Sequence, residues 1–315
     1  MIQVEHLTRR YGAVTAVDDL SFEISDEGVY GFLGPNGAGK STTMNIMTGC
    51  LSATSGTVKI SGYDIYEQPR EAKRRLGYLP EQPPLYLGET PREYLRFVGA
   101  AKGLRGAELT RQIDSVIEET RIDDMRDRRI SALSKGYRQR VGIAQALLGS
   151  PDTVILDEPT VGLDPLQIVE IRELIASLGE SRTVLISSHI LSEVQTMCSR
   201  ILIISQGKLV AYGEPEQLEA RLSAPGVITV GADTDSATAQ ELIAALPGAA
   251  GISVTSESEG HTRMVVTASE GDIYELSRSI FRAFAASGHV LSELDVKKAN
   301  LEDIFLELTE GGEQA

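Results

Sequence analysis

Long hydrophobic runs are missing from this sequence of 315 residues. The longest ones, such as residues 201–204 and 154–156, are far shorter than the ~20 apolar residues that a membrane-crossing helix needs. Residues 1–10 mix Glu5, Arg9 and other polar residues with alternating apolar ones, which fits an edge strand and lacks the apolar core of a secretion signal. These absences predict that the chain has no transmembrane helix and stays in the cytoplasm.

Positive charge and cysteine are also scarce. The sequence has 30 lysines and arginines against 45 aspartates and glutamates, so its formal net charge is −15 at pH 7. No lysine-arginine block is longer than residues 73–75, whereas a nucleic-acid binder usually presents a basic surface. We therefore expect no nucleic-acid partner. Cys50 and Cys198 fit no metal-ligand or redox spacing and are expected to be free thiols.

A glycine-rich segment dominates what the sequence does contain. Residues 34–42 read Gly-Pro-Asn-Gly-Ala-Gly-Lys-Ser-Thr and directly follow a short apolar run, residues 29–33. A buried strand, a glycine-rich turn and Lys-Ser at a helix start together predict a phosphate-binding loop, and this full context disfavours a chance glycine-rich turn. The candidate nucleotide-binding residues are Gly34, Pro35, Asn36, Gly37, Ala38, Gly39, Lys40, Ser41 and Thr42.

Each part of this loop has a chemical role in the prediction. Glycines allow positive φ angles, so that successive backbone N–H groups can point at an anion. The positive N-terminal end of the following helix favours phosphate as well. Lys40 can reach the β- and γ-phosphates of a nucleotide, and the Ser41 hydroxyl is placed for Mg²⁺.

Strand and helix patterns predict an α/β fold for the larger part of the chain. Residues 2–25 alternate between apolar and polar and predict antiparallel strands, broken at residues 11–12 and 18–19. A mainly helical subdomain is expected over about residues 85–150. Its first helix is predicted to begin at Thr90, with Pro91 at the first helical position. The other predicted strands are residues 57–60, 76–79, 153–156 and 183–187 and a hairpin of 201–204 with 209–212; the other helices are 166–178 and 191–197. Alternating strands and helices imply a largely parallel sheet.

The length and the 42% hydrophobic content suit one large domain, residues 1–219, and a small accessory domain, residues 220–315. The small domain has the element order β-α-β-β-α-β plus a last helix, which matches a ferredoxin-like α+β arrangement. Its predicted strands are residues 227–230, 252–255, 264–267 and 290–296, and its predicted helices are 237–246, 273–286 and 301–308.

Two acids follow the apolar run at residues 153–156. Asp157 would stand at the carboxyl edge of the sheet beside the phosphate loop, where Mg²⁺ needs a second protein ligand. Glu158 comes next and can accept a proton from the water that attacks the γ-phosphate, which is the role of a general base. Alone, such a pair indicates a solvated strand end. Beside a phosphate loop, it indicates nucleotide hydrolysis.

With these motifs in this order, the chain resembles the nucleotide-binding subunit of an ABC transporter over about residues 1–215. Residues 133–137, Leu-Ser-Lys-Gly-Tyr, resemble the signature motif of that family. The resemblance implies that Ser134 and Gly136 contact the γ-phosphate of ATP held by a second copy. Without it, Ser134 is a helix cap.

Two residues of this motif depart from the family pattern. Lys135 replaces a usual glycine, and Tyr137 replaces a usual glutamine. The phosphate donors Ser134 and Gly136 are kept.

The same resemblance assigns roles to further residues. Gln82 matches the glutamine that senses Mg²⁺ and water and relays movement to the membrane partner, although by itself it fits a polar turn between prolines. His189 matches a histidine that contacts the γ-phosphate, and Asp164 lies in a loop that crosses the dimer seam. Tyr11 matches the aromatic residue that stacks on adenine, and a turn tyrosine packed on the sheet is the alternative.

Residues 133–165 and the tail at residues 300–309 are similar to ATPases of type-2 exporters, including gliding-motility and drug-export systems. In that group the C-terminal domain has no catalytic role. The resemblance implies ATP and Mg²⁺ as cofactors, a separate transmembrane permease, and a second ATPase copy in a head-to-tail homodimer. It also implies a peripheral location on the cytoplasmic face of the cell membrane, through the permease.

Two other classes remain as alternatives to transport. A soluble ABC ATPase acting on ribosomes or nucleic acid usually carries two cassettes, or a long coiled coil between phosphate loop and signature, and this chain has one cassette with a short gap. A regulatory ATPase without transport is the other alternative, although all hydrolytic positions are filled. ATP-driven export through a permease is therefore the expected function.

Overall fold

The computed structural model describes residues 1–222, 226–258, 260–269 and 273–297. Their contacts divide them into two compact units, one of residues Met1–Pro215 and one that begins at Glu216. The domain boundary predicted between residues 219 and 220 stays a prediction and falls within helix α8 (Pro215–Leu222). Across the described ranges, no helix has the length and apolar character needed to cross a bilayer.

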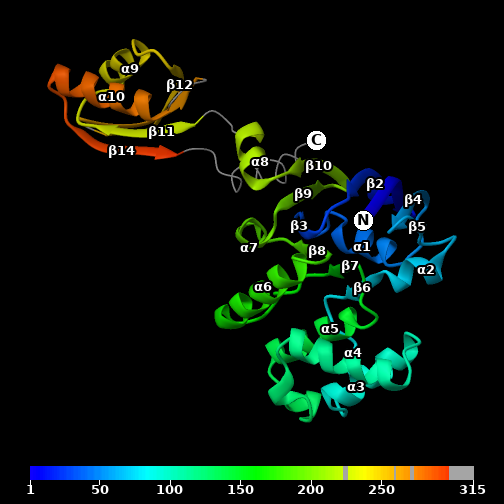
Figure 1. The fold of residues 1–315 in the computed structure, drawn as a ribbon. Helices are drawn as coiled ribbons and strands as arrows, with labels where there is room; N and C mark the ends of the chain where they lie inside the picture. The colour runs from blue at the N-terminus through cyan, green and yellow to red at the C-terminus, as the bar shows by residue number, and fades with distance from the viewer. Residues whose placement is uncertain (223–225, 259, 270–272, 298–315) are drawn as a thin grey trace. The chain divides into compact units, whose positions relative to one another are not determined.

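A six-stranded sheet forms the centre of the first unit (Figure 1). Its strand order is β10 (Lys208–Gly213), β9 (Arg200–Ser205), β3 (Gly28–Leu33), β8 (Thr183–Ser188), β7 (Thr153–Leu156) and β6 (Leu76–Leu79). Neighbouring strands are parallel except for β10 and β9, which form an antiparallel hairpin. The carboxyl ends of β3, β7 and β8 therefore meet at one edge of the sheet, and the loops that follow them share that edge.

Strands β7 and β8 are buried at every position, as expected for parallel strands covered on both faces. Helices α6 (Pro165–Gly179) and α7 (Leu191–Met197) pack against β3 and β8. Helix α1 (Lys40–Met47) belongs to a hydrophobic cluster that also includes Phe32 of the central sheet and Leu7 of a second sheet. The members of this cluster in α1 are Met44, Ile46 and Met47, and Ala38 of the preceding loop belongs to it as well, so the cluster holds both the helix and the loop between the two sheets.

The second sheet of this unit is antiparallel, with the order β2 (Val14–Ile24), β1 (Ile2–Tyr11), β4 (Ser55–Ile60) and β5 (Tyr63–Asp64). The predicted break at Tyr11–Gly12 is found, but the break predicted at Asp18–Asp19 is wrong. Strand β2 runs through both residues because the register with β1 shifts there and Asp19 adopts a positive φ of 53°. Such a bulge accommodates an extra polar residue without ending the strand.

The predicted helical segment contains three packed helices, α3 (Pro91–Ala101), α4 (Gly106–Glu119) and α5 (Lys135–Leu147). Short turns at Asp123–Met125 and Ile130–Ala132 connect α4 to α5. The start of α3 is a capping box: the Thr90 side chain accepts from Glu93 N, and the Glu93 carboxylate accepts from Thr90 N. Helix α5 also packs on β6, which joins this segment to the central sheet.

Two elements of the first unit were not predicted. Helix α2 (Pro69–Arg74) lies between the predicted strands 57–60 and 76–79, where no helix was predicted, and β5 is only a short strand. Both are short and lack a regular apolar pattern, which is the signal that the other elements provided. The two cysteines are free, with Cys50 exposed and Cys198 buried.

The described part of the second unit begins with most of α8, which was not predicted, and beyond it contains a four-stranded antiparallel sheet and two further helices. In chain order its elements are β11 (Val227–Ala232), α9 (Ser236–Ala244), β12 (Ala249–Ser258), β13 (His261–Ala268), α10 (Ile273–Ser287) and β14 (Leu291–Lys297). The strand order β12-β13-β11-β14 and the packing of both helices on the sheet match the predicted ferredoxin-like arrangement. The helix predicted at residues 301–308 lies outside the described residues.

Candidate functional site

The glycine-rich loop connects β3 to α1 at the edge where the parallel strands end. Gly37 and Gly39 have φ angles of 83° and 101°, in the left-handed region that favours glycine. A Cβ atom added to Gly39 would lie 2.4 Å from the carbonyl oxygen of Ala16, so the backbone of β2 leaves no room for a side chain. A positive φ therefore accounts for the glycines at 37 and 39, and close approach to β2 is a second reason at Gly39. Gly34 has no positive φ, but a Cβ there would lie 2.5 Å from the carbonyl oxygen of Ile204.

Lys40 is buried at the start of α1, with 5% of its surface exposed. Its Nζ donates to the carbonyl oxygens of Gly34 at 2.7 Å and Pro35 at 3.2 Å. Burial lowers the pKa of Lys40, while the Glu158 and Asp157 carboxylates oppose that shift. The ammonium group is thus held within the loop and lies 3.8 Å from Glu158 Oε1.

Asp157 directly follows β7, at the carboxyl edge of the sheet, and is 4% exposed. The Ser187 hydroxyl donates to Asp157 Oδ1 at 2.5 Å and accepts from the backbone N–H of Glu158 at 2.8 Å. Burial raises the pKa of Asp157, and the charges of Glu158 and Glu81 add to this, whereas Ser187 and Lys40 oppose it. Ser187 therefore fixes both acids, a role that the sequence interpretation missed.

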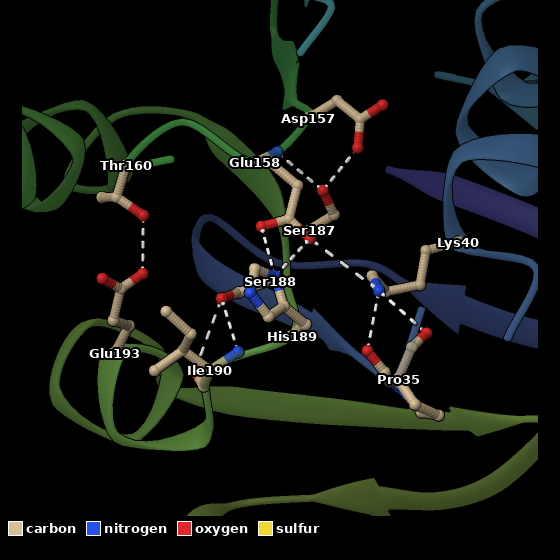
Figure 2. A network of polar contacts seen from close by, with 11 residues as sticks. Pro35, Lys40, Asp157, Glu158, Thr160, Ser187, Ser188, His189, Ile190 and Glu193 are labelled. Atoms are coloured by element: carbon tan, nitrogen blue, oxygen red, sulfur yellow. Dashed lines mark hydrogen bonds and ion pairs between the residues drawn. The ribbon is translucent and has the colours of Figure 1, made fainter. Parts of the chain in front are cut away.

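Glu158 lies between a cation and an imidazole (Figure 2). His189 Nδ1 is 3.1 Å from Glu158 Oε1 and 3.0 Å from Oε2. Glu158 also has a positive φ of 47°, which is uncommon for a residue with a long side chain. The two residues predicted to act on water and on the γ-phosphate are thus brought into direct contact.

A cavity of about 310 Å³ lies at this edge of the sheet. The residues that line it are Ala16, Asn36, Gly37, Gly39, Lys40, Ser41, Thr42, Glu81, Glu158, Val161 and His189. Glu81 is among them, whereas the predicted Gln82 is not. Gln82 was predicted from the family resemblance. Glu81 and Gln82 both follow Pro80 after β6, and nothing in the local sequence indicates which of the two side chains faces the cavity.

The donor set of the cavity fits a triphosphate and a hard divalent cation. The loop N–H groups and Lys40 suit phosphate oxygens, and the Ser41 hydroxyl and the Glu81 carboxylate, which line the cavity, can supply oxygen ligands. The predicted ligand Asp157 does not line the cavity in this structure but directly precedes Glu158, which does. Within the described residues no group of three or more His, Cys, Asp or Glu side chains is arranged to hold a metal ion by itself. A Mg²⁺ ion here would therefore need phosphate oxygens to complete its ligands, which is its usual mode of binding.

The signature residues lie apart from this cavity and do not line it. Ser134 caps α5 by accepting from Tyr137 N, and a Cβ on Gly136 would lie 2.8 Å from Gln167 Cδ. Asp164 caps α6 by accepting from Gln167 N at 2.9 Å. These three residues therefore sit where α5 and α6 begin, next to one another.

The two departures from the signature pattern also make local contacts. A Cβ on Gly162 would lie 2.1 Å from Lys135 Nζ, so this ammonium covers the loop before α6. The Tyr137 hydroxyl donates to Asp124 Oδ2 at 2.9 Å.

Tyr11 is at the turn between β1 and β2, 46% exposed, and does not line the cavity. The guanidinium of Arg9 lies 4.6 Å from the centre of its ring. One face of the Tyr11 ring is thus already in contact with a cation in this structure.

A phosphate loop between a parallel strand and a helix, with two acids at the end of a neighbouring strand, defines the class of P-loop nucleotide hydrolases. A family model for ABC transporters matches residues 17–161. The chain is 33% identical over 311 residues to the linearmycin resistance ATP-binding protein LnrL of Bacillus subtilis (strain 168), covering 98% of each chain. The chain therefore belongs to the family of ABC transporter ATP-binding proteins, and it is an ATP-binding and ATP-hydrolysing enzyme.

Two further comparisons agree with this assignment. The Nod factor export ATP-binding protein I of Ralstonia nicotianae (strain ATCC BAA-1114 / GMI1000) is 32% identical over 310 residues, covering 98% of this chain and 94% of that protein. A solved structure of an ATP binding subunit of an ABC transporter aligns with a TM-score of 0.63 at 32% identity, covering 70% of this chain and 92% of that one. The predicted family, the fold of the ATPase and ATP hydrolysis are confirmed.

Proposed function

We propose that this chain powers export through a separate membrane permease, and that two copies bind ATP between them in head-to-tail order. One reason is that LnrL is named for linearmycin resistance and the Nod factor protein for export. The other is that Ser134 and Gly136 do not line the cavity of their own copy. A second copy would bring these two groups to the γ-phosphate, and the permease would hold the pair at the cytoplasmic face of the membrane.

In this proposal, different residues bind the phosphates, the adenine and the Mg²⁺ ion of one ATP molecule. The backbone of residues 34–39 and Lys40 hold the phosphates, and Tyr11 stacks on adenine. Ser41 and Asp157 would hold Mg²⁺, with Glu81 or Gln82 as a further contact, and the ion would neutralise charge on the β- and γ-phosphates.

The hydrolytic step uses Glu158 and His189. Water attacks the γ-phosphorus, its proton passes to the Glu158 carboxylate, and ADP leaves as the bond to the β-phosphate oxygen breaks. His189 orients Glu158 and contacts the γ-phosphate. The main observation that supports these hydrolytic roles is the contact of both Glu158 carboxylate oxygens with His189 Nδ1 at the wall of the phosphate cavity.

The permease is proposed to contact the surface that includes residues 82–97. Tyr86, Leu87 and Phe97 are exposed there by 51%, 50% and 53%, and the rings of Tyr86 and Phe97 are 5.2 Å apart. Large apolar side chains gathered on a surface mark a contact with a protein partner.

A direct test is Glu158→Gln. The amide keeps the size of the side chain but cannot accept the proton, so hydrolysis should fall by about 100-fold or more, while ATP binding is retained. Hydrolysis is measured by phosphate release and binding by equilibrium titration, and light scattering should show ATP-dependent dimers. Full turnover in this variant would remove the proposed base.

The partners are tested separately. The tagged chain is extracted from membranes in mild detergent, and the proteins that remain bound are identified by mass spectrometry. A multi-span permease supports the export proposal, whereas ribosomes or nucleic acid would contradict it. Replacing Phe97 with serine should weaken the permease association and leave the ATPase of the isolated chain unchanged.

A further inference from the structure

A second buried contact lies to one side of the Glu158 and His189 pair, at the left in Figure 2. The Thr160 hydroxyl donates to Glu193 Oε2 at 2.6 Å. Thr160 comes two residues after Glu158, and Glu193 lies in α7, which begins shortly after His189. Both residues are 5% exposed. The loop after β7 and the helix after β8 are therefore joined twice, once inside the cavity and once outside it.

The Glu193 carboxylate is only partly compensated. Its nearest cation is Arg172 of α6, with the Nη2 atom 3.8 Å from Glu193 Oε1. The Nε atom of Arg172 is buried and has no hydrogen-bond partner. A buried carboxylate with one short hydrogen bond and one distant guanidinium is costly, and apolar residues of similar size are often equally stable or better. Overall stability therefore does not explain why Glu193 is a carboxylate.

The backbone at Glu158 gives a reason. Its positive φ of 47° is a conformation that persists only where the surroundings hold it. On one side the Glu158 N–H is held by the Ser187 hydroxyl at 2.8 Å. On the other side the next fixed side chain is Thr160, held by Glu193. The two attachments therefore flank the backbone from which the Glu158 side chain extends.

We propose that Glu193 is a positioning residue for hydrolysis: by holding Thr160, it keeps the Glu158 carboxylate against His189 and the phosphate cavity. Glu193 touches neither nucleotide nor water in this role and acts through Thr160 and the backbone of residues 158–160. The inference rests on the proposed function of Glu158 as the base. Misplacing a reacting group by about 1 Å costs up to about 100-fold in rate, so a loosened carboxylate should lower turnover without weakening ATP binding.

The main test is Thr160→Val, which removes the hydroxyl and keeps the branched shape. We expect kcat to fall by about tenfold while the KM for ATP changes by less than about twofold. Thr160→Ser restores the hydroxyl and should restore most of kcat. The ¹⁵N resonance of His189 Nδ1, which reports its contact with Glu158, should move in Thr160→Val and return in Thr160→Ser.

The matched control is Thr120→Val. Thr120 is fully buried at the end of α4, and its hydroxyl donates to Val116 O at 2.6 Å, away from the cavity. This variant also loses one buried hydrogen bond, so it should lose similar stability while kcat and the His189 resonance stay unchanged. Equal effects of Thr160→Val and Thr120→Val on kcat, or an unmoved His189 resonance in both, would overturn the proposal.

A second variant covers the case in which Thr160→Val does not fold. Glu193→Gln keeps the length of the side chain and can still accept from Thr160, but it loses the charge that attracts Arg172. It should show the same separation of kcat from KM to a smaller extent, and unchanged kinetics would count against the proposal. Glu158→Gln is measured in parallel. If it retains hydrolysis, the proposed base is wrong; if it alone loses hydrolysis, only the positioning role fails.

Discussion

Single residues at the cavity carry charges that the fold has to tolerate. Asp157 is buried, the charges of Glu158 and Glu81 act on it, and the charge of Lys40 opposes them. The raised pKa of Asp157 means that its ionised carboxylate is less stable in the folded chain than in water. Residues of this kind are kept for chemistry and at some cost in stability.

The first prediction at this scale is that Asp157→Asn raises the melting temperature. The folded-state pKa of Asp157 is above its ordinary value of 3.8, so the folded chain binds more protons than the unfolded one between those two values. Wild-type stability therefore falls as the pH rises through that window and stays lower above it. The gain of Asp157→Asn should be largest at neutral pH and should disappear below the ordinary pKa. Calorimetric melting without nucleotide at several pH values measures it, and a gain independent of pH would contradict the cause given.

The second prediction separates two neighbours. Glu81 lines the cavity and Gln82 does not, so Glu81→Gln should raise the Mg²⁺ concentration that gives half-maximal ATPase by about tenfold, the effect typical of losing an acid near a bound metal. Gln82→Ala is the control and should shift this concentration much less. The measurement is ATPase rate against Mg²⁺ at saturating ATP. A larger shift in Gln82→Ala would restore the role that the family resemblance gave to Gln82.

At the scale of helices and strands, sequence signals worked where they were both local and regular. Thr90, Pro91 and Glu93 marked the start of α3 because capping chemistry acts within one turn. Strands β7 and β8 could be predicted from their apolar runs, because strands that are buried on both faces need mostly apolar residues.

Other elements could not be predicted for equally physical reasons. The bulge at Asp19 depends on pairing with β1, and α2 is too short to show a helical period. The same limit applies to predicting the residues of the site. The phosphate loop and the two acids follow from local order, but Ser187, Glu193 and Glu81 acquire their contacts only when segments distant in sequence come together in the fold.

At the scale of the molecule, the two units have separate hydrophobic cores. Phe284 is fully buried in the core of the second unit. We expect Phe284→Ala to cost about 3–5 kcal/mol of stability in that unit, because it leaves a large cavity. ATP affinity and the unfolding transition of the first unit should be unchanged. Calorimetry with nucleotide titration measures both, and a parallel fall of ATP affinity would show that the two cores do not act separately.

The contacts of Lys40 have a consequence for the repeated turnover of such an enzyme. Its ammonium already donates to two oxygens of the loop that precedes it, Gly34 and Pro35. When spent nucleotide departs, this cation needs neither solvent nor a substitute anion, since its own segment supplies the partners. The phosphate loop can therefore keep its shape between turnovers. Lys40 then exchanges its hydrogen bonds to the loop carbonyls for contacts with the phosphates of the next ATP.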